Sequence, residues 1–148
     1  MKPVSDEVLL RQLQWRYATK KFDPADFEGF LKLLPRRAGK LPLRHALEVR
    51  HASFKDPRFY DLARKYNAAI VYAQDDDFPE IDEPTADFTY ARLMKSEDKV
   101  KTGYKPADLD KWAKRARNWA KRGDAFVYFI SGAKVRNPAA AQALIERL

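Results

Sequence analysis

The chain has 148 residues, a formal net charge of +8, 45% hydrophobic and 13% aromatic residues, which suits one folded domain and excludes a wholly disordered chain. The absence of cysteine excludes disulfides, thiolate metal sites and a cysteine nucleophile, and two histidines are too few for a three-histidine metal site. No apolar run is long enough to span a membrane, and the start MKPVSDE lacks the order of a signal peptide, so we expect a cytoplasmic protein.

Two helices are predicted in the first quarter of the chain. Ser5 can cap a helix over 5–17, although residues 8–14 also fit a short strand. The dipeptide Asp-Pro begins a second helix over 23–34, because Asp is a common N-cap residue and Pro suits the first helical position. Pro35 ends this helix.

The rest of the chain alternates strands with helices. The predicted elements are a strand over 42–51, a helix over 56–66, strands over 68–73 and 88–94, a helix over 106–122, a strand over 125–130 and a helix over 138–148. Several of these strands are continuously apolar, which is typical of strands buried on both faces. The pattern therefore indicates βα units and a mainly parallel sheet.

Two charged blocks lie close together in the sequence. Residues 75–87 contain seven acids and no base, whereas residues 95–122 contain ten bases and four acids. The simpler interpretation is a solvated loop and a solvated helix face, and the alternative is a functional patch. The bases over 111–122 are interleaved with Trp112 and Trp119, a pattern also found in nucleic-acid interfaces. Both tryptophans fall on the apolar face of the predicted helix, so we expect them in the core and expect no nucleic-acid partner.

A group of polar residues is predicted on the inner face of the sheet. When the apolar residues of the strand over 42–51 face the helices, Glu48 and Arg50 point to the opposite face, and the same alternation places Tyr90 and Arg92 there. Burying these charges is costly unless they pair with each other or with a ligand. One hypothesis is an anion site, in which the two arginines bind a phosphate or carboxylate and Tyr90 supplies a hydroxyl. The other is an ion network without a ligand.

Two further residues, and a chemical role for Glu48, belong to this hypothesis. Glu48 is a candidate catalytic acid or base, His51 a candidate assistant, and Asp75 a candidate ligand-binding residue that follows the strand over 68–73. An ordinary strand-end histidine and a solvated loop acid are the alternatives for His51 and Asp75. A metal would need all three to converge, and we expect none. Glycine-rich phosphate loops and the G-x-S-x-G elbow are absent, which argues against nucleotide enzymes of those classes and against an α/β-hydrolase, and leaves open whether the protein is an enzyme.

Several segments resemble one known family. They are LRHALEVRHASF (43–54), ADFTYARLM (86–94), LDKWAKRARNW (109–119) and FVYFISGAKVRNPAAAQALIERL (126–148). They are similar to the YecE-like family, domain of unknown function 72, which has a TIM-barrel fold and no assigned function. The family's inward Glu-x-Arg-His pattern matches Glu48, Arg50 and His51, and its Tyr-x-Arg pattern matches Tyr90 and Arg92.

The resemblance implies the fold and domain organisation. It covers 22–148 and corresponds only to the fifth to eighth strands of the barrel. We therefore expect a single domain over 1–148 in the α/β class: half of a TIM-like (β/α)8 barrel of about four βα units, preceded by an atypical N-terminal helix over 1–21. A natural truncation, a rearrangement and a recombined product would each give such a chain.

A second resemblance lies in the N-terminal segment. The stretch LLRQLQWRYATKKFD (9–23) is similar to the opening of FMN-dependent nitroreductases, in which residues matching Arg16 and Lys20 contact the flavin phosphate. The rest of that fold is missing from the sequence. We therefore interpret the segment as a borrowed or coincidental helix and expect no cofactor.

The expected half-barrel suggests partners. It would expose two sheet edges and an apolar inner face, and both favour association. We expect a homodimer, which could close an eight-stranded barrel, and a small anionic ligand. A non-catalytic structural fragment that self-associates is the alternative function, together with nucleic-acid binding through the face over 111–122.

Overall fold

The computed structural model describes residues 20–148, so the helix predicted over 5–17 and its alternative strand over 8–14 lie outside the described residues. The helices are α1 (Pro24–Leu33), α2 (Pro57–Lys65), α3 (Pro106–Ala120) and α4 (Asn137–Ile145), with short 3-10 helices at Ala52–Phe54 and Lys134–Arg136. The strands are β1 (Arg37–Ala38), β2 (Leu41–Pro42), β3 (His45–Leu47), β4 (Ala68–Ile70), β5 (Tyr72–Gln74), β6 (Phe88–Leu93) and β7 (Asp124–Phe129).

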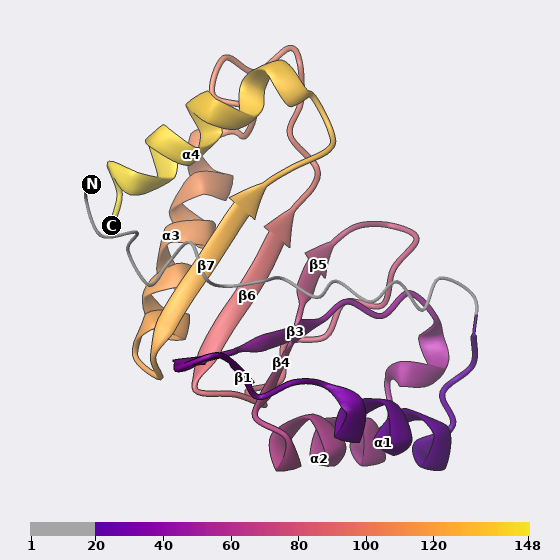
Figure 1. Cartoon of the computed structure of the whole chain (residues 1–148). Coiled ribbons are helices and arrows are strands. Elements are labelled where there is room, and N and C mark those ends of the chain that lie inside the picture. Colours follow the sequence, from indigo (N-terminus) through magenta and orange to yellow (C-terminus); the bar gives the residue numbers. More distant parts are fainter. Residues whose placement is uncertain (1–19) are drawn as a thin grey trace.

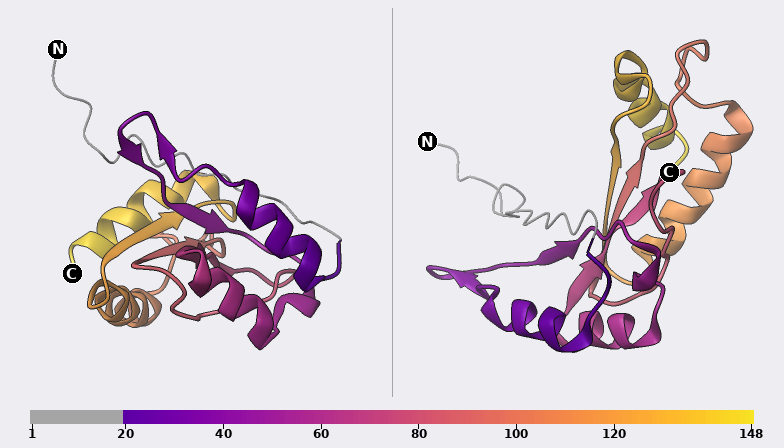
Figure 2. Two further views of the ribbon diagram at one scale, coloured as in Figure 1. Left: turned by 60° about the horizontal axis from the view of Figure 1, so that its bottom comes forward. Right: turned by 90° about the vertical axis from the view of Figure 1, so that its right-hand side faces the viewer.

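The main strands form two parallel sheets that meet at a sharp bend. β3 pairs with β4, β5 with β6, and β6 with β7, all in parallel. Only Val71 separates β4 from β5, and its N–H donates to the carbonyl oxygen of Leu47 at 2.9 Å. The strand predicted over 68–73 is thus one extended segment whose first part, β4, pairs with β3 and whose second part, β5, pairs with β6. Figures 1 and 2 show the bend at this point.

All four helices lie on the outer side of the two sheets (Figure 2). α1 and α2 cover the outward residues of β3 and β4, including Leu47 and Val49. α3 and α4 cover the outward residues of β6 and β7, including Ala91 and Leu93. Strands with helices on one face and a curved, helix-free opposite face are the arrangement of half a (β/α)8 barrel. The predicted fold class and alternation are confirmed.

Helices α1 and α2 begin where the sequence predicts. The carboxylate of Asp23 accepts a hydrogen bond from the N–H of Asp26 at 2.8 Å, and that of Asp56 accepts one from the N–H of Arg58 at 2.8 Å. In both helices a proline follows the N-cap residue, where its missing N–H is not needed. Across residues 20–148, no helix combines the length and the apolar character needed to cross a bilayer.

The strand predicted over 42–51 is wrong in its extent. β3 covers only His45–Leu47, and β2 belongs to an antiparallel hairpin with β1. Pro42 has no N–H to continue a ladder, and Gly39 at φ +62° makes the hairpin turn. Each strand of the hairpin has only two residues, so it shows no alternation that sequence analysis could detect.

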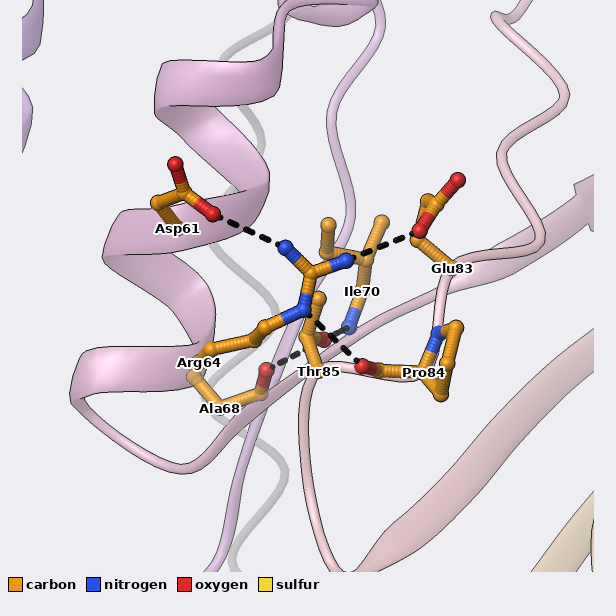
Figure 3. A network of polar contacts seen from close by, with 7 residues as sticks. All are labelled: Asp61, Arg64, Ala68, Ile70, Glu83, Pro84 and Thr85. Atoms are coloured by element: carbon orange, nitrogen blue, oxygen red, sulfur yellow. Dashed lines mark hydrogen bonds and ion pairs between the residues drawn. The ribbon is translucent and has the colours of Figure 1, made fainter.

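The second half of the acidic segment is anchored to the fold. The guanidinium of Arg64 in α2 donates to Glu83 at 2.9 Å. The hydroxyl of Thr85 donates to the carbonyl of Ala68 at 2.8 Å and accepts from the N–H of Ile70 at 3.1 Å (Figure 3). These bonds join the segment to β4. The predicted solvated loop therefore describes only part of residues 75–87.

Two glycines allow a matched test of the fold. Gly123 precedes β7 at φ +143°, and an added Cβ would lie 2.0 Å from the carbonyl oxygen of Asp87. We expect Gly123→Ala to lower the free energy of unfolding by more than about 1 kcal/mol, because neither the backbone angle nor the space suits alanine. Gly29 lies in α1 with open space around it, so Gly29→Ala should raise stability by about 0.5–1 kcal/mol. Urea unfolding measures both, and equal effects would contradict the described geometry at Gly123.

Candidate functional site

Glu48 is the centre of the candidate site. It directly follows β3, and only 1% of the residue is exposed. Arg92, in β6, donates from its guanidinium to one oxygen of the Glu48 carboxylate. Arg50 donates from Nη2 to the other oxygen, Oε1, at 3.1 Å. The structure therefore brings together three of the predicted site residues, which we call the Glu48 cluster.

Strand alternation places the Glu48 cluster on the inner face. In β6, Ala91 and Leu93 pack outward against α3 and α4. Tyr90 packs among inward residues of the neighbouring strands, and Arg92 has the same parity. Arg92 lies near the carboxyl end of β6, and Glu48 lies just beyond the carboxyl end of β3. In barrels of this type the carboxyl ends of the strands carry the functional residues.

Arg50 is the most accessible member of the cluster. Its side chain is 17% exposed, and its guanidinium carbon lies 4.3 Å from the ring centroid of Phe78. Its Nε is buried and has no hydrogen-bond partner among the described residues. The cluster contains two guanidinium groups and one carboxylate, so it carries one excess positive charge. A buried cation with an unused donor can bind an anion.

Tyr90 lies beside the cluster in a largely apolar setting. Its ring stacks on that of Tyr128 in β7, with centroids 5.0 Å apart and planes 26° from parallel. Burial is the main cause that raises the pKa of Tyr90 to about 12. Tyr128 also raises this pKa, and the opposing effects of the Arg92 and Glu48 charges are smaller. The phenol is therefore neutral at physiological pH and can donate a hydrogen bond.

The other two predicted site residues make local contacts. Nδ1 of His51 accepts from the N–H of Ser53 at 3.1 Å and lies 2.8 Å from its Oγ, so His51 caps the short 3-10 helix that follows. One carboxylate oxygen of Asp75 accepts from the N–H of Asp77 at 2.8 Å, which closes a turn. The hydrogen bonds described for these two residues do not join the Glu48 cluster.

Three residues near the inner face were missed by sequence analysis. Alternation along the strand over 125–130 could have placed Tyr128 inward. No sequence pattern indicated Phe78, because it lies in an irregular acidic segment. Arg44 pairs with Asp124 at 2.7 Å and lies over the rings of two inward phenylalanines, at the amino ends of the strands. The inner face therefore carries a cation at each end.

One base of α3, Arg115, and one of its tryptophans contact the acidic segment. Arg115 donates to Asp82 at 2.8 Å and to the hydroxyl of Tyr72 at 2.9 Å. Trp119 is buried, and its Nε1 donates to Asp82 at 2.9 Å. Trp112 is partly buried against the same core. The prediction that these tryptophans belong to the core is confirmed.

Two hollows lie away from the Glu48 cluster. One of about 380 Å³ is lined by Gln74, Lys95, Tyr104 and the first turns of α3, and its cations Lys95 and Arg115 already pair with acids. The other, of about 720 Å³, is formed by β7, α3 and α4. Within the part of the chain that the structure describes, no three His, Asp or Glu side chains gather as a metal site requires.

Comparison with known proteins identifies relatives. A family described as protein of unknown function DUF72 matches residues 5–148. The fold is similar to that of a DUF72 family protein from Thermotoga maritima, with a TM-score of 0.64 and 18% identity, covering 90% of this chain and 54% of that one. A DUF72 family protein from Enterococcus faecalis gives a TM-score of 0.64 and 13% identity, covering 91% and 59%. No curated protein matches the chain.

These comparisons confirm the predicted family and half-barrel. The chain spans a little over half the length of the solved relatives, and at such low identities the likeness shows the fold alone. The family match begins at residue 5, so it extends beyond the predicted 22–148 and includes the segment over 9–23. The comparisons do not show the resemblance of that segment to nitroreductases. Arg16 lies outside the described residues, and Lys20 pairs with Asp26 at 2.7 Å.

Removing the charge of Glu48 tests the cluster. We expect Glu48→Gln to lower the free energy of unfolding by about 3–5 kcal/mol, because it leaves two arginines against a neutral amide. Asp61→Asn is the matched control, since Asp61 pairs with Arg64 at an exposed position and should change stability by less than about 1 kcal/mol. Chemical denaturation measures both variants. A Glu48→Gln protein as stable as the control would show that the cluster does not stabilise the fold.

Proposed function

Since the chain belongs to the DUF72 family, whose function is unknown, we propose a function from the site itself: the Glu48 cluster binds a small molecule through a phosphate or carboxylate group. One observation carries the proposal. Arg50 has a buried Nε without a described partner, beside a cluster with one excess positive charge. A bound anion would neutralise that charge and accept the unused hydrogen bond.

The cluster gives its members different roles in this proposal. The carboxylate of Glu48 fixes both guanidinium groups, and the ring of Phe78 supports the outer one. Two planar guanidinium groups held in place suit the oxygens of a phosphate or carboxylate. Arg50 is the more exposed of the two, so the anion reaches Arg50 first. Tyr90 adds a neutral hydroxyl donor near Arg92.

Two other roles stay predictions. Glu48 as a catalytic acid or base would have to act while it holds both arginines, and His51 would have to leave its contacts with Ser53. Asp75 would have to turn from its local hydrogen bond to the ligand. The alternative to anion binding is that the Glu48 cluster is an ion network that stabilises the fold without a ligand. The cytoplasmic location also stays a prediction.

Replacement of Arg50 tests anion binding directly. We expect Arg50→Ala to weaken the binding of inorganic phosphate or acetate by about 10- to 100-fold, because charge-assisted hydrogen bonds are lost. Isothermal titration calorimetry at pH 7 measures the affinity, with acetate distinguishing a carboxylate site from a phosphate site. Arg58→Ala is the control, since Arg58 is an exposed arginine paired with Asp56.

Three outcomes of the Arg50 experiment decide the proposal. The anion site is supported if Arg50→Ala binds phosphate or acetate more weakly than Arg58→Ala does and keeps the circular dichroism spectrum of the wild type. Wild-type protein that binds neither anion at millimolar concentration overturns it. An equal loss of anion affinity in Arg50→Ala and Arg58→Ala also overturns the proposal, because the binding would then be a general effect of surface charge.

The hydroxyl of Tyr90 provides a second test. We expect Tyr90→Phe to weaken phosphate binding by about 2- to 10-fold, the loss of one hydrogen bond. Since the pKa of Tyr90 is about 12, the phenol keeps its proton below that pH and loses it above. The difference between wild type and Tyr90→Phe should therefore stay constant from pH 7 to pH 10. A difference that disappears over this range would contradict a neutral donor role.

A further inference from the structure

We propose that the outer edge of β7 binds the β3 edge of a second copy of this chain, so that each copy contributes four strands to one closed barrel. This inference goes beyond anion binding and rests on different observations. They are the edge strand itself, the hollow beside it, the second edge at β3 and the charges at the ends of both edges.

The edge of β7 lacks the usual protection. Among the described strands β7 pairs only with β6, and residues 125–130 read AFVYFI, without a charged residue or a proline. Tyr128 and Ile130 are each 40% exposed, whereas β6 is buried along nearly its whole length. Proteins usually protect such edges with charges, prolines or bulges, because open edges pair with other chains. An apolar edge of six residues therefore indicates an interface.

The hollow of about 720 Å³ continues this surface outward. It is lined by β7, the second half of α3 and α4, mostly by apolar side chains. Ile145 and Leu148, at the end of α4, are largely exposed beside it. A strand added to β7 would bring a helical layer with it, because helices cover the outer side of this sheet throughout. The apolar rim is where such a layer would pack.

A second copy fits this surface because the chain has a matching free edge. Among the described strands β3 pairs only with β4, so it is the free edge of the adjoining β3–β4 sheet, at the opposite end of the strand order from β7. All main pairs are parallel, and a twofold axis along the barrel would place each β3 beside the β7 of the other copy in the same direction. This chain covers 54% and 59% of the solved relatives. The remainder of each relative is nearly as long as the part that matches, so their fold has room for a second half of similar size.

The charges at the two edges are complementary. The hairpin of β1 and β2 lies just before β3 and presents the exposed bases Arg36, Arg37 and Lys40. β7 begins at Asp124, which pairs with Arg44 of its own copy but keeps 66% of its side chain exposed. Parallel pairing aligns the amino ends of the two strands. It therefore brings the basic hairpin of one copy toward Asp124 of the other, where opposite charges favour the correct orientation.

Sedimentation velocity of the full chain tests association. We expect the wild type at micromolar concentration to have twice the 17.2 kDa mass of one chain. Ile130→Lys places a charge on the edge of β7 and should weaken self-association by at least about tenfold. Asn118→Lys adds the same charge to the exposed face of α3 and should leave the dimer unchanged. A monomeric wild type, or a dimer insensitive to Ile130→Lys, would overturn the proposal.

Cross-linking tests which edges meet. Because the chain contains no cysteine, Ala46→Cys in β3 and Phe126→Cys in β7 each introduce a single thiol. Both positions face inward near the aligned amino ends, so a mixture of the two variants should form a disulfide-linked pair under mild oxidation. Phe126→Cys linked only to itself would indicate that two β7 edges meet. That result, or a dimeric mixture without mixed disulfide, would overturn the four-plus-four arrangement.

Discussion

The burial of the Glu48 carboxylate constrains the rest of the structure. A carboxylate that is 1% exposed must have charged or hydrogen-bonding partners, and Arg92 supplies one from the other sheet. The pair therefore fixes β3 relative to β6 across the concave face. Arg50 donates to the other carboxylate oxygen, and the two guanidinium groups together exceed the charge of Glu48 by one. The architectural pair and the proposed anion site thus follow from one buried acid.

The sequence predicted the parts of the fold that depend on local periodicity. Alternation in the strand over 88–94 placed Leu93 outward and Arg92 inward, and both orientations are observed. The Asp-Pro helix starts and the apolar stripe containing Trp119 were equally predictable, because capping and helical spacing are local properties. The convergence of Glu48 with Arg92 followed only once the sheet was assumed to be parallel and closed on one side by helices.

Features that depend on distant contacts were not predictable. At Val71 the chain changes strand partner: β4 before it pairs with β3, and β5 after it pairs with the second half of β6. The run of apolar residues around Val71 shows no sign of this change. The position of Phe78 over Arg50 depends on the path of an irregular segment. That path depends in turn on bonds such as that from Arg64 to Glu83, whose partners are 19 residues apart.

The two outer cores occupy successive parts of the chain, which has a consequence for synthesis. The core under β3 and β4 uses residues from Phe22 to Ile81, and the core under β6 and β7 uses residues from Tyr72 to Ala143. Domains and their parts can fold as they emerge from the ribosome. All described residues of the first core precede Arg92 in the sequence, so that core can form before the partner of Glu48 in β6 has been made. If it does, we expect the carboxylate to stay hydrated until β6 packs against it.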